Sequence, residues 1–293
     1  MKKYKAIPDP DGSLFLCSDS PGKGIFEFQQ MVLSYYFKNG RKMPWRETTD
    51  PYHILVSEIM LQQTQVERVL KKFPEFILAF PDFTALATAP LADILAVWQG
   101  MGYNRRAIAL QKCAILVMKD YQGCLPEEVE TLATFPGIGR ATAGSIAAFA
   151  FNMPVVFIET NIRRVFIHFF FPGSATVGDA EILPLVEQTL YRNNPRVWYW
   201  ALMDLGTSLK NTVSNPNRRS AHYSRQSSFH GSDRKIRGSI LKILLEEHFM
   251  EDLDFIVRLG EDHGRVKRIL VTLESEGFIQ RTGDGYQLKN TRG

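Results

Sequence analysis

The stretch TFPGIGRATAG, residues 134–144, decides how the rest of the chain is interpreted. A short helical pattern, EEVETLAT, precedes it, and an alanine-rich helical pattern, RATAGSIAAFAF, overlaps and follows it. Pro136, Gly137 and Gly139 interrupt the helix between them, because proline lacks an amide proton and glycine adopts backbone conformations closed to other residues. The stretch therefore predicts two helices joined by a turn with a bare backbone.

Such a turn has two interpretations. Amide groups at the start of a helix lack partners within that helix, and they can donate to an anion with the support of the helix dipole. With Arg140 at the same place, the turn has the form of a helix-hairpin-helix, which holds DNA phosphates without reading bases. The alternative is a tight turn that only packs two helices together.

Composition and length fit an ordinary globular protein. The chain has 293 residues, 45% of them hydrophobic and 23% charged, with a formal net charge of +4. This surplus is too small to establish a nucleic-acid partner by itself. Cys17, Cys113 and Cys124 lack metal-ligand spacing and favour a reduced protein without a disulfide framework. The N-terminus has no secretory signal pattern and the apolar runs are short, so we expect a soluble protein without a membrane partner.

Helical periodicity dominates residues 25–209, and proline and glycine mark the joints between helices. No strand pattern occurs before residue 230, so we expect this region to be all-α. The predicted helices cover residues 25–37, 51–63, 65–80, 82–87, 90–98, 103–120, 127–133, 139–151, 158–171, 179–193 and 195–209.

The pattern changes near the C-terminus. Residues 210–232 are polar and basic, which is typical of a linker. Three further helical patterns follow, and then GFIQRTGDGYQLK (277–289) alternates around a TGDG turn as a β-hairpin does. Three helices followed by a hairpin is the order of a winged-helix module.

Two carboxylates occupy unusual surroundings. Glu58 lies among apolar residues of the predicted helix 51–63, and Glu159 follows the apolar run VVFI (155–158). Burying a carboxylate is costly unless it is paired or protonated, and desolvation raises the pKa of such a group, which suits a general acid. Taken singly, each is better explained as a helix cap or as the ion-pair partner of Arg163 or Arg164.

Six segments in one order carry a resemblance that covers residues 25–210. They resemble the helix-hairpin-helix DNA glycosylase superfamily, and most closely its A/G-mismatch adenine glycosylase (MutY) family. The SEIMLQQTQV segment is the most specific of them, whereas the hairpin alone would mark only the superfamily. The segments are PWR (44–46), SEIMLQQTQV (57–66), LAVWQGMGYNRRA (95–107), FPGIGRATAG (135–144), FIETNIRRV (157–165) and MDLG (203–206).

The resemblance implies a fold. We expect an all-α, two-lobed helix-hairpin-helix glycosylase fold with a small C-terminal α+β winged-helix domain. The expected domains are an N-terminal arm (1–24), a discontinuous terminal lobe (25–45 and 151–209), a six-helix barrel with the hairpin (46–150), a basic linker (210–232) and a winged-helix-like domain (233–293).

The resemblance also implies catalytic roles. In that family the glutamate of the S-E-x-M-L-Q-Q-T motif protonates the target adenine, and Glu58 matches it. Protonation is needed because adenine is a poor leaving group as an anion. A carboxylate then stabilises the sugar cation, much as in glycoside hydrolysis. Where the family has an aspartate, in D-G-N-V, this chain has Glu159, whose longer side chain leaves its distance from the sugar open.

Base-pocket and DNA-binding residues follow from the same resemblance. Trp45, Arg46 and Asp204 are expected to line the base pocket, and Gln63 matches a glutamine that inserts into the duplex beside the flipped nucleotide. The alternatives are that Trp45 belongs to the core and that Gln63 is a solvated helix residue. Residues 136–140 are expected to hold a backbone phosphate, with a monovalent cation as a candidate ligand there. The expected DNA-binding residues are Gln62, Gln63, Pro136, Gly137, Ile138, Gly139, Arg140 and Asn161.

Two departures from the family bear on its chemistry. Bifunctional relatives carry a lysine that forms a Schiff base where this chain has Ala141, so we expect a monofunctional enzyme. The family's [4Fe–4S] cluster is held by C-x6-C-x2-C-x5-C, whereas the matching positions here are Lys210, Asn217, Ser220 and Gln226. We therefore expect neither an iron–sulfur cluster nor another resident metal or cofactor.

A third departure is the C-terminal domain, since typical relatives end in a Nudix-like domain that reads 8-oxoguanine. The third helix of the winged-helix-like domain carries Arg265, Lys267 and Arg268, as a recognition helix does, although winged helices also contact proteins. The cations of the linker segment either contact DNA phosphates or are simply solvated. They are Lys210, Arg218, Arg219, His222 and Arg225.

The expected protein is a monomeric DNA repair glycosylase, cytoplasmic and associated with the nucleoid. It acts on double-stranded DNA with a mismatched or damaged base, and hydrolyses the N-glycosidic bond of adenine opposite guanine or 8-oxoguanine. Two alternatives stay open. One is a glycosylase for uracil or thymine in mismatches, and the other is a DNA-binding module with decayed catalysis.

Overall fold

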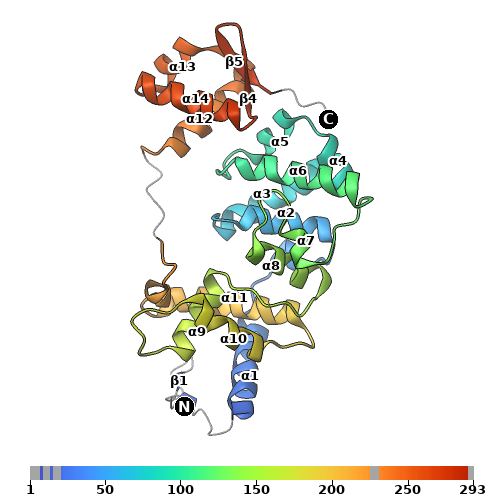
Figure 1. The fold of residues 1–293 in the computed structure, drawn as a ribbon, viewed down its shortest axis with the longest axis vertical. Coiled ribbons are helices and arrows are strands. Elements are labelled where there is room, and N and C mark those ends of the chain that lie inside the picture. The colour runs from blue at the N-terminus through green and yellow to red at the C-terminus, as the bar shows by residue number, and fades with distance from the viewer. Residues whose placement is uncertain (1–6, 9–13, 16–20, 225–230, 290–293) are drawn as a thin grey trace. The chain divides into compact units, whose positions relative to one another are not determined.

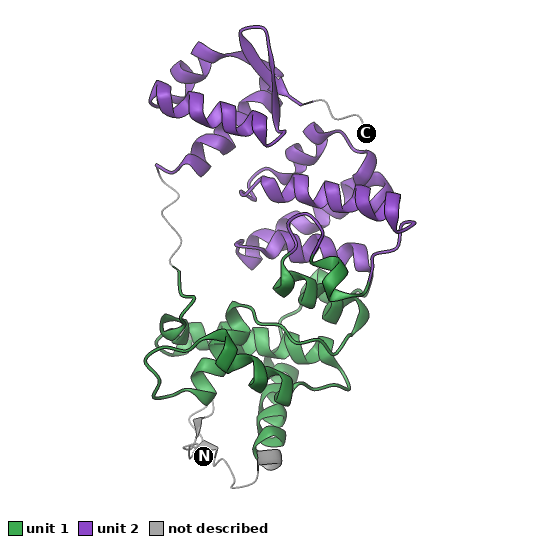
Figure 2. Cartoon of the chain, in the orientation of Figure 1, with its two compact units in different colours: residues 1–49, 127–133, 139–225 green, residues 50–126, 134–138, 226–293 purple. Residues whose placement is uncertain are grey.

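The computed structural model describes residues 21–224 and 231–289, together with the short segments 7–8 and 14–15 (Figure 1). The chain divides into two compact units (Figure 2). Unit 1 comprises residues 1–49, 127–133 and 139–225, and unit 2 comprises residues 50–126, 134–138 and 226–293. Helices dominate both units and a small sheet lies near the C-terminus, which confirms the expected all-α fold with a C-terminal α+β domain. Within the described ranges, no helix combines the length and apolar character needed to cross a membrane.

Unit 1 holds the first helix, the two helices that flank the glycine turn, and the helices that follow it. Its elements are α1 (Pro21–Asn39), the 3₁₀ helix η1 (Pro44–Arg46), α7 (Val129–Leu132), α8 (Arg140–Phe151), α9 (Thr160–Phe170), α10 (Asp179–Thr189), α11 (Pro195–Thr212) and the 3₁₀ helix η2 (Pro216–Arg219).

An aromatic cluster forms the core of unit 1. The Phe28 ring of α1 meets the rings of Phe166, Phe169 and Phe170 on α9 and of Trp198 on α11, with centroid separations of 5.0–5.9 Å and edge-to-face geometry. Such pairs each contribute about 0.5–1.5 kcal/mol beyond the burial of their surface. The cluster therefore packs α1 against α9 and α11, which carry Asn161 and Asp204 respectively.

Unit 2 contains the first five helices of the expected barrel and the C-terminal residues, whereas α7 and α8 belong to unit 1. Its helices before the linker are α2 (Pro51–Leu61), α3 (Val66–Ala79), α4 (Phe83–Thr88), α5 (Leu91–Trp98) and α6 (Arg105–Asp120). The hydroxyl of Tyr52 on α2 donates to the backbone oxygen of Phe80 at 2.5 Å, and Trp98 on α5 meets Phe76 on α3 at 5.8 Å. These buried contacts hold α3 against α2 and α5.

Residues 231–289 form the part of unit 2 that we call the C-terminal module. Its predicted helices and hairpin are present, and a further strand, β3, makes a three-stranded antiparallel sheet in the order β3-β5-β4. β3 has three residues, too few for an alternating pattern to show in the sequence. The elements are α12 (Asp233–Glu247), β3 (Phe249–Glu251), α13 (Asp252–Leu259), α14 (His263–Ser275), β4 (Ile279–Thr282) and β5 (Gly285–Leu288).

The expectation of no strand before residue 230 is wrong. β1 (Ile7–Pro8) and β2 (Leu14–Phe15) pair antiparallel, with Ile7 opposite Phe15. Each strand has two residues, so neither carries a period that the sequence could reveal. The first helix also begins at Pro21 rather than at Ile25.

Candidate active site and DNA interface

Asp204 on α11 is the centre of a buried ion-pair cluster in unit 1. Its two carboxylate oxygens accept from Nη1 and Nη2 of Arg46, each at 2.9 Å, which is a bidentate pair. Arg41 donates its backbone amide and its Nε to the same carboxylate, each at 2.8 Å. The side chain of Arg46 is 6% exposed and that of Asp204 is 2% exposed. Arg46 and Asp204, two of the three predicted base-pocket residues, are thus in direct contact. Arg41, which the sequence did not predict, binds the same carboxylate.

Aromatic rings surround this cluster. The guanidinium carbon of Arg46 lies 5.9 Å from the ring centroid of Tyr36 and 5.5 Å from that of Trp200, within cation–π range. Trp45 belongs to the same 3₁₀ helix as Arg46 and is 4% exposed. Its burial agrees with the alternative that it is a core residue, and its contact with a base stays a prediction.

The pKa of Asp204 reflects this environment. Burial alone would raise the pKa, but the hydrogen bonds and charges of Arg46 and Arg41 outweigh burial and leave it below the usual value. The carboxylate therefore contributes folding stability above pH ~3.9, the ordinary aspartate pKa, and the contribution is lost as the pH falls through the lowered pKa.

Replacing Asp204 by asparagine is expected to lower the free energy of unfolding by about 3 kcal/mol, because Arg46 would stay buried without an anionic partner. Urea unfolding at pH 7 measures the loss. Asp179→Asn is the matched control, since its Arg163 pair is more exposed and is worth less than about 1 kcal/mol. Equal losses in both variants would contradict the account of Asp204.

Glu159 is the N-cap of α9. Its Oε1 accepts from the backbone amides of Asn161 at 2.7 Å and Ile162 at 2.9 Å, and its Oε2 accepts from Nδ2 of Asn161 at 3.3 Å. A capping carboxylate satisfies amides that have no partner inside the helix. Glu159 is therefore a helix cap, which was one of the alternatives for it in the sequence. The side chain of Glu159 folds back over the first turn of α9.

The pKa of Glu159 is shifted upward. Burial raises the pKa, and the amide hydrogen bonds together with the charges of Arg164 and Arg163 oppose that shift only in part. Glu159 therefore takes up a proton at a higher pH than an ordinary glutamate does.

Asn161 and Gly206 position this end of α9. Asn161 Oδ1 accepts from Nη1 of Arg164 at 2.7 Å, and the same Nη1 donates to the backbone oxygen of Gly206 at 2.6 Å. A Cβ at position 206 would lie 2.4 Å from the backbone oxygen of Asn161, so only glycine permits α11 to approach α9 this closely. The predicted contact of Asn161 with DNA stays a prediction.

Glu58 lies on α2 in unit 2 and is half-buried. Asp50 caps this helix by accepting from the amide of Tyr52 at 2.8 Å, and Pro51 occupies its first turn. The residues that follow Glu58, Ile59 and Met60, are 1% exposed, so Glu58 is a half-buried carboxylate on a largely apolar helix. Glu58 and Glu159 belong to different units, and the catalytic roles that the resemblance implies for them stay predictions.

Arg106 fixes the end of α2, a role that the sequence did not reveal. Its guanidinium donates to the backbone oxygens of Ile59 at 3.0 Å and Met60 at 2.8 Å, and to Gly102 at 3.1 Å. Helix C-termini carry partial negative charge and unpaired carbonyls, so a cation there is stabilising. Burial lowers the pKa of Arg106 to about 10.

The turn after α2 presents the two predicted glutamines. Gln62 is the C-cap residue and its Nε2 donates to the backbone oxygen of Gly137 at 3.0 Å. Gln63 is exposed and has a φ of 54°, a left-handed conformation that is uncommon outside glycine. The structure therefore places Gln62 against the hairpin turn and leaves Gln63 accessible.

The hairpin turn itself has the bare backbone that the sequence predicts. Gly139 is the N-cap of α8 and supplies no side-chain hydrogen bond to the first turn. The Arg140 side chain is 83% exposed, and its Nη2 lies 3.5 Å from Glu130. Pro136 accepts from the thiol of Cys113 through its backbone oxygen at 3.2 Å, which ties the turn to α6.

The two glycines of the turn are expected to respond differently to alanine. Gly137 has a φ of 75°, and a Cβ there would lie 2.8 Å from Cβ of Ala109. Gly137→Ala is therefore expected to lower the free energy of unfolding by about 2 kcal/mol. At Gly139 a Cβ meets no described atom within 4 Å. Gly139→Ala is expected to preserve stability but to weaken DNA binding about tenfold, because its methyl group occupies the approach to the α8 amides.

Denaturant unfolding and fluorescence anisotropy with a labelled duplex measure these two effects. The account of the turn fails if Gly139→Ala binds DNA as tightly as the unsubstituted chain does.

The residues at the cluster-ligand positions do not fit an iron–sulfur cluster. Lys210, Asn217 and Ser220 supply no thiolate, and Gln226 lies outside the described residues. Arg225, one of the linker cations, also lies outside them. Nδ2 of Asn217 donates to the backbone oxygen of Thr160 at 2.8 Å. Hydrogen bonds within the protein thus hold this segment against the start of α9.

Arg219, predicted as a candidate phosphate contact, also has a role within unit 1. Its guanidinium donates to the backbone oxygens of Phe171, Ser174 at 3.2 Å and Ile167 at 3.2 Å. These bonds join η2 to the end of α9. Lys210 and Arg218 are exposed, so DNA contact by these two stays a prediction.

Comparison with known proteins gives consistent results. Residues 56–182 match the family described as HhH-GPD superfamily base excision DNA repair protein. The chain is 33% identical over 283 residues to an adenine DNA glycosylase of Mycobacterium tuberculosis, which covers 87% of this chain and 90% of that protein. It is also 33% identical over 206 residues to the adenine DNA glycosylase of Homo sapiens, which covers 66% of this chain and 37% of that protein.

Solved structures show the same fold. A thermostable thymine-DNA glycosylase superposes with a TM-score of 0.58 at 26% sequence identity, covering 64% of this chain and 88% of that chain. A trapped endonuclease III–DNA covalent intermediate superposes with a TM-score of 0.50 at 18% identity, covering 65% and 86% of the two chains, a likeness of fold alone.

Proposed function

The chain belongs to the adenine DNA glycosylase family of the HhH-GPD base excision repair proteins, and from this premise we propose that it removes adenine mispaired with guanine or 8-oxoguanine. It is a DNA glycosylase, hence a hydrolase, and its substrate is DNA. The observation that carries the proposal is the carboxylate at both motif positions, Glu58 on α2 and Glu159 at the N-cap of α9.

Glu58 is proposed as the general acid. Its carboxyl group gives a proton to a ring nitrogen of adenine, so that the base leaves as a neutral molecule when the bond to C1′ breaks. The electron pair of that bond departs with adenine, and the sugar becomes an oxocarbenium-like cation. Water then adds its oxygen to C1′ and releases a proton to a neighbouring carboxylate, which leaves an abasic site.

Glu159 is proposed as the anion that stabilises this cation. A fixed negative charge beside a developing positive charge lowers the barrier without reorganisation during the reaction. Two amide hydrogen bonds hold Oε1, whereas Oε2 accepts only the longer bond from Asn161 among the described contacts. Oε2 is therefore the oxygen that we assign to the sugar.

Ala141 supports a monofunctional reaction. It lies exposed in the first turn of α8 and has no amine, so the chain offers no lysine nitrogen there to attack C1′. We propose that water is the nucleophile, that no iron–sulfur cluster or other cofactor takes part, and that the enzyme acts as a monomer. A monovalent cation at residues 136–140 remains the candidate ligand of the hairpin.

The experiment is an excision assay at enzyme excess on duplexes with A:8-oxoG, A:G, G:T and G:U pairs, followed by alkali to cleave abasic sites. Strand cleavage restricted to the adenine duplexes, and dependent on alkali, is the expected result. G:T and G:U are included because the chain resembles a thymine-DNA glycosylase in structure. Cleavage of those duplexes alone would overturn the adenine assignment, and binding without any abasic product would favour a DNA-binding module.

A further inference from the structure

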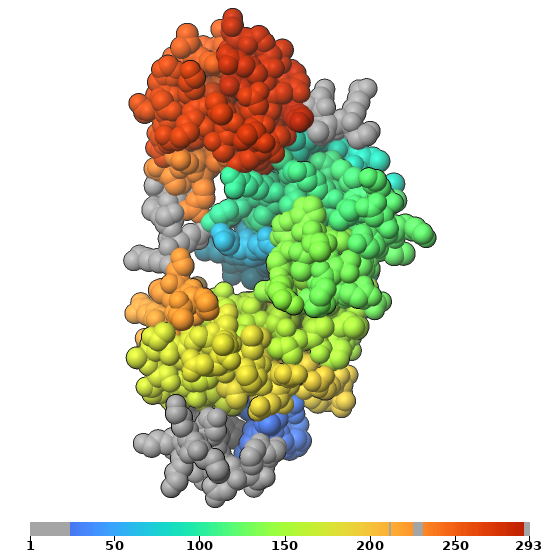
Figure 3. Space-filling view, in the orientation of Figure 1, coloured from blue at the N-terminus to red at the C-terminus, as the bar shows by residue number. Residues whose placement is uncertain are grey.

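A large groove in unit 2 is not used by the proposed chemistry. Its volume is about 1130 Å³, and its walls are α12 and α14 of the C-terminal module on one side and the α5–α6 loop (99–104) on the other. In Figure 3 the module (orange to red) lies next to the surface formed by α5 and α6 (green). The groove is therefore bounded by the two sequence-distant parts of one unit.

Contacts between the module and α6 define the walls of this groove. Glu276, the C-cap residue of α14, forms ion pairs with Arg105 on α6 and with Arg237 on α12. Arg234 on α12 donates to the hydroxyl of Tyr103 and lies 5.3 Å from its ring centroid. The contacts of Arg105 and of Tyr103 join the module to the start of α6 and to the α5–α6 loop, the segments that form the other wall.

The groove is strongly cationic. Lysine and arginine side chains line it from α3, α6, α12 and α14, whereas Asp233 is the carboxylate among its described lining residues. Lys235 and Lys242 on α12 are exposed, and Arg268 on α14 is 66% exposed with a 3.8 Å pair to Asp233. A row of solvent-accessible cations from several helices matches a polyanion better than it matches an ordinary protein surface.

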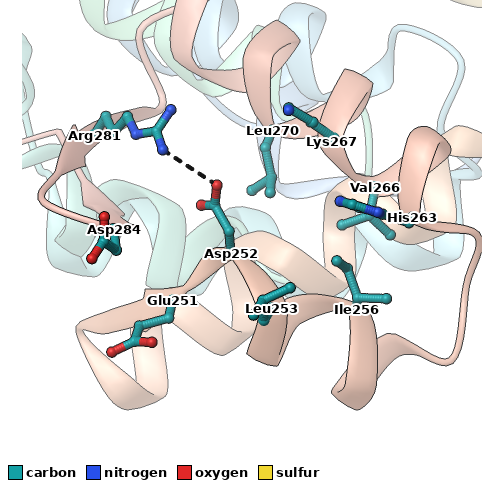
Figure 4. Close-up of a pocket in the computed structure, with 10 residues that line it drawn as sticks. All are labelled: Glu251, Asp252, Leu253, Ile256, His263, Val266, Lys267, Leu270, Arg281 and Asp284. Atoms are coloured by element: carbon teal, nitrogen blue, oxygen red, sulfur yellow. Dashed lines mark hydrogen bonds and ion pairs between the residues drawn. The ribbon is translucent and has the colours of Figure 1, made fainter.

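A second surface of the module has a different charge. A cavity of about 360 Å³ there is lined by Glu251, Asp252 and Asp284 as well as by Lys267 and Arg281, whose side chains Figure 4 draws. Asp252 pairs with Arg281 at 3.5 Å. This surface is not suited to phosphate, because its three carboxylates outnumber the side chains of Lys267 and Arg281.

The three cations predicted to form a recognition helix do not share a surface. Arg265 pairs with Asp233 at 2.7 Å and with Glu261 at 3.2 Å, Lys267 lines the cavity of Figure 4, and Arg268 lines the groove. The cationic face of the module is therefore formed mainly by α12, with Arg268 of α14.

Gln62 and Gln63 line the same groove. DNA in the groove would therefore lie beside the turn that the sequence predicts to enter the duplex. We propose that this groove holds the phosphate backbone of the substrate duplex, so that the C-terminal module is a second DNA-binding element beside the Gln62–Gln63 turn. The inference rests on the proposed function, which supplies double-stranded DNA as the occupant.

The test compares two triple variants of the full chain with equal change in net charge. Lys235→Ala, Lys242→Ala and Arg268→Ala remove exposed cations of the groove. The control is Lys112→Ala, Lys119→Ala and Lys267→Ala, which are exposed and do not line it. The dissociation constant for a duplex with a tetrahydrofuran abasic analogue opposite 8-oxoguanine is measured at several salt concentrations.

The groove variant is expected to bind at least about tenfold more weakly. The slope of log K against log salt is expected to become shallower by about 0.9 for each phosphate that the variant no longer neutralises. The control variant should keep the slope of the unsubstituted chain. Equal slopes in all three proteins, as expected if the groove serves a protein partner, would overturn the inference.

Excision of adenine in the same proteins separates this inference from the proposed function. Normal excision with an unchanged slope in the groove variant refutes the groove alone. A shallower slope in that variant, with no excision by the unsubstituted chain, refutes the adenine reaction and supports the groove.

Discussion

Replacing Glu58 by glutamine is expected to slow adenine excision by about 10⁴-fold, which corresponds to about 5.5 kcal/mol in the barrier. Glutamine preserves the size of the side chain and its capacity for hydrogen bonds, but it cannot give up a proton to the leaving base. The rate is measured in a single turnover at enzyme excess with an A:8-oxoG duplex, so that product release does not contribute.

Binding is the control for this variant. Glu58 is one half-buried side chain on a helix whose capping and apolar packing are untouched by the change, so the fold should persist. Glu58→Gln is therefore expected to bind the duplex with an affinity close to that of the unsubstituted chain. Excision within about tenfold of normal would mean that adenine leaves without this acid, or that the true substrate is a base that leaves as an anion.

Replacing Glu159 by glutamine is expected to slow excision by about 10³-fold, or about 4 kcal/mol. The amide oxygen of glutamine still accepts from the amides of Asn161 and Ile162, so the N-cap survives while the negative charge is removed. Glu159→Asp is the matched variant, because it retains the charge on a shorter side chain. Its rate should lie well above that of Glu159→Gln.

The pH dependence gives a second readout for Glu159. Only the ionised carboxylate can stabilise a cation, and burial raises the pKa of Glu159. Excision should therefore fall as the pH falls through this raised pKa, so the acid limb of the profile should lie above the ordinary glutamate value of about 4.3. In Glu159→Gln that limb should vanish. An unchanged acid limb in Glu159→Gln would show that another group titrates there.

The long helices could be predicted because apolar side chains recur along them at the spacing of an α-helix. The sequence predicts helices over 103–120 and 195–209, and the structure has α6 from Arg105 to Asp120 and α11 from Pro195 to Thr212. Short strands carry no such signal. β1, β2 and β3 have two or three residues each, and they are strands only because a partner pairs with them.

The candidate site could be predicted only where a motif carried it. Arg46, Asp204 and Glu159 stand in segments with a family resemblance, and the structure shows their contacts. Arg106 stands in such a segment too, yet its task depends on carbonyl groups of α2 and of the α5–α6 loop that converge only in the fold. Arg41 likewise reaches Asp204 across 163 positions of chain.

The distribution of cations over the different surfaces of the C-terminal module could not be predicted from the sequence either. Arg265, Lys267 and Arg268 are close together in α14, but a helix turns by about 100° per residue, so neighbouring side chains face different ways. The pairing of Arg265 with Asp233 depends on the packing of α14 against α12, which no local pattern encodes.

The identity of the released base tests the central claim most directly. The unsubstituted chain is incubated in excess with an A:8-oxoG duplex, and the small molecules freed are separated and identified by mass spectrometry. The account predicts free adenine, in an amount equal to the abasic sites formed, and none from Glu58→Gln. Abasic sites without free adenine, or adenine released equally by Glu58→Gln, would contradict it.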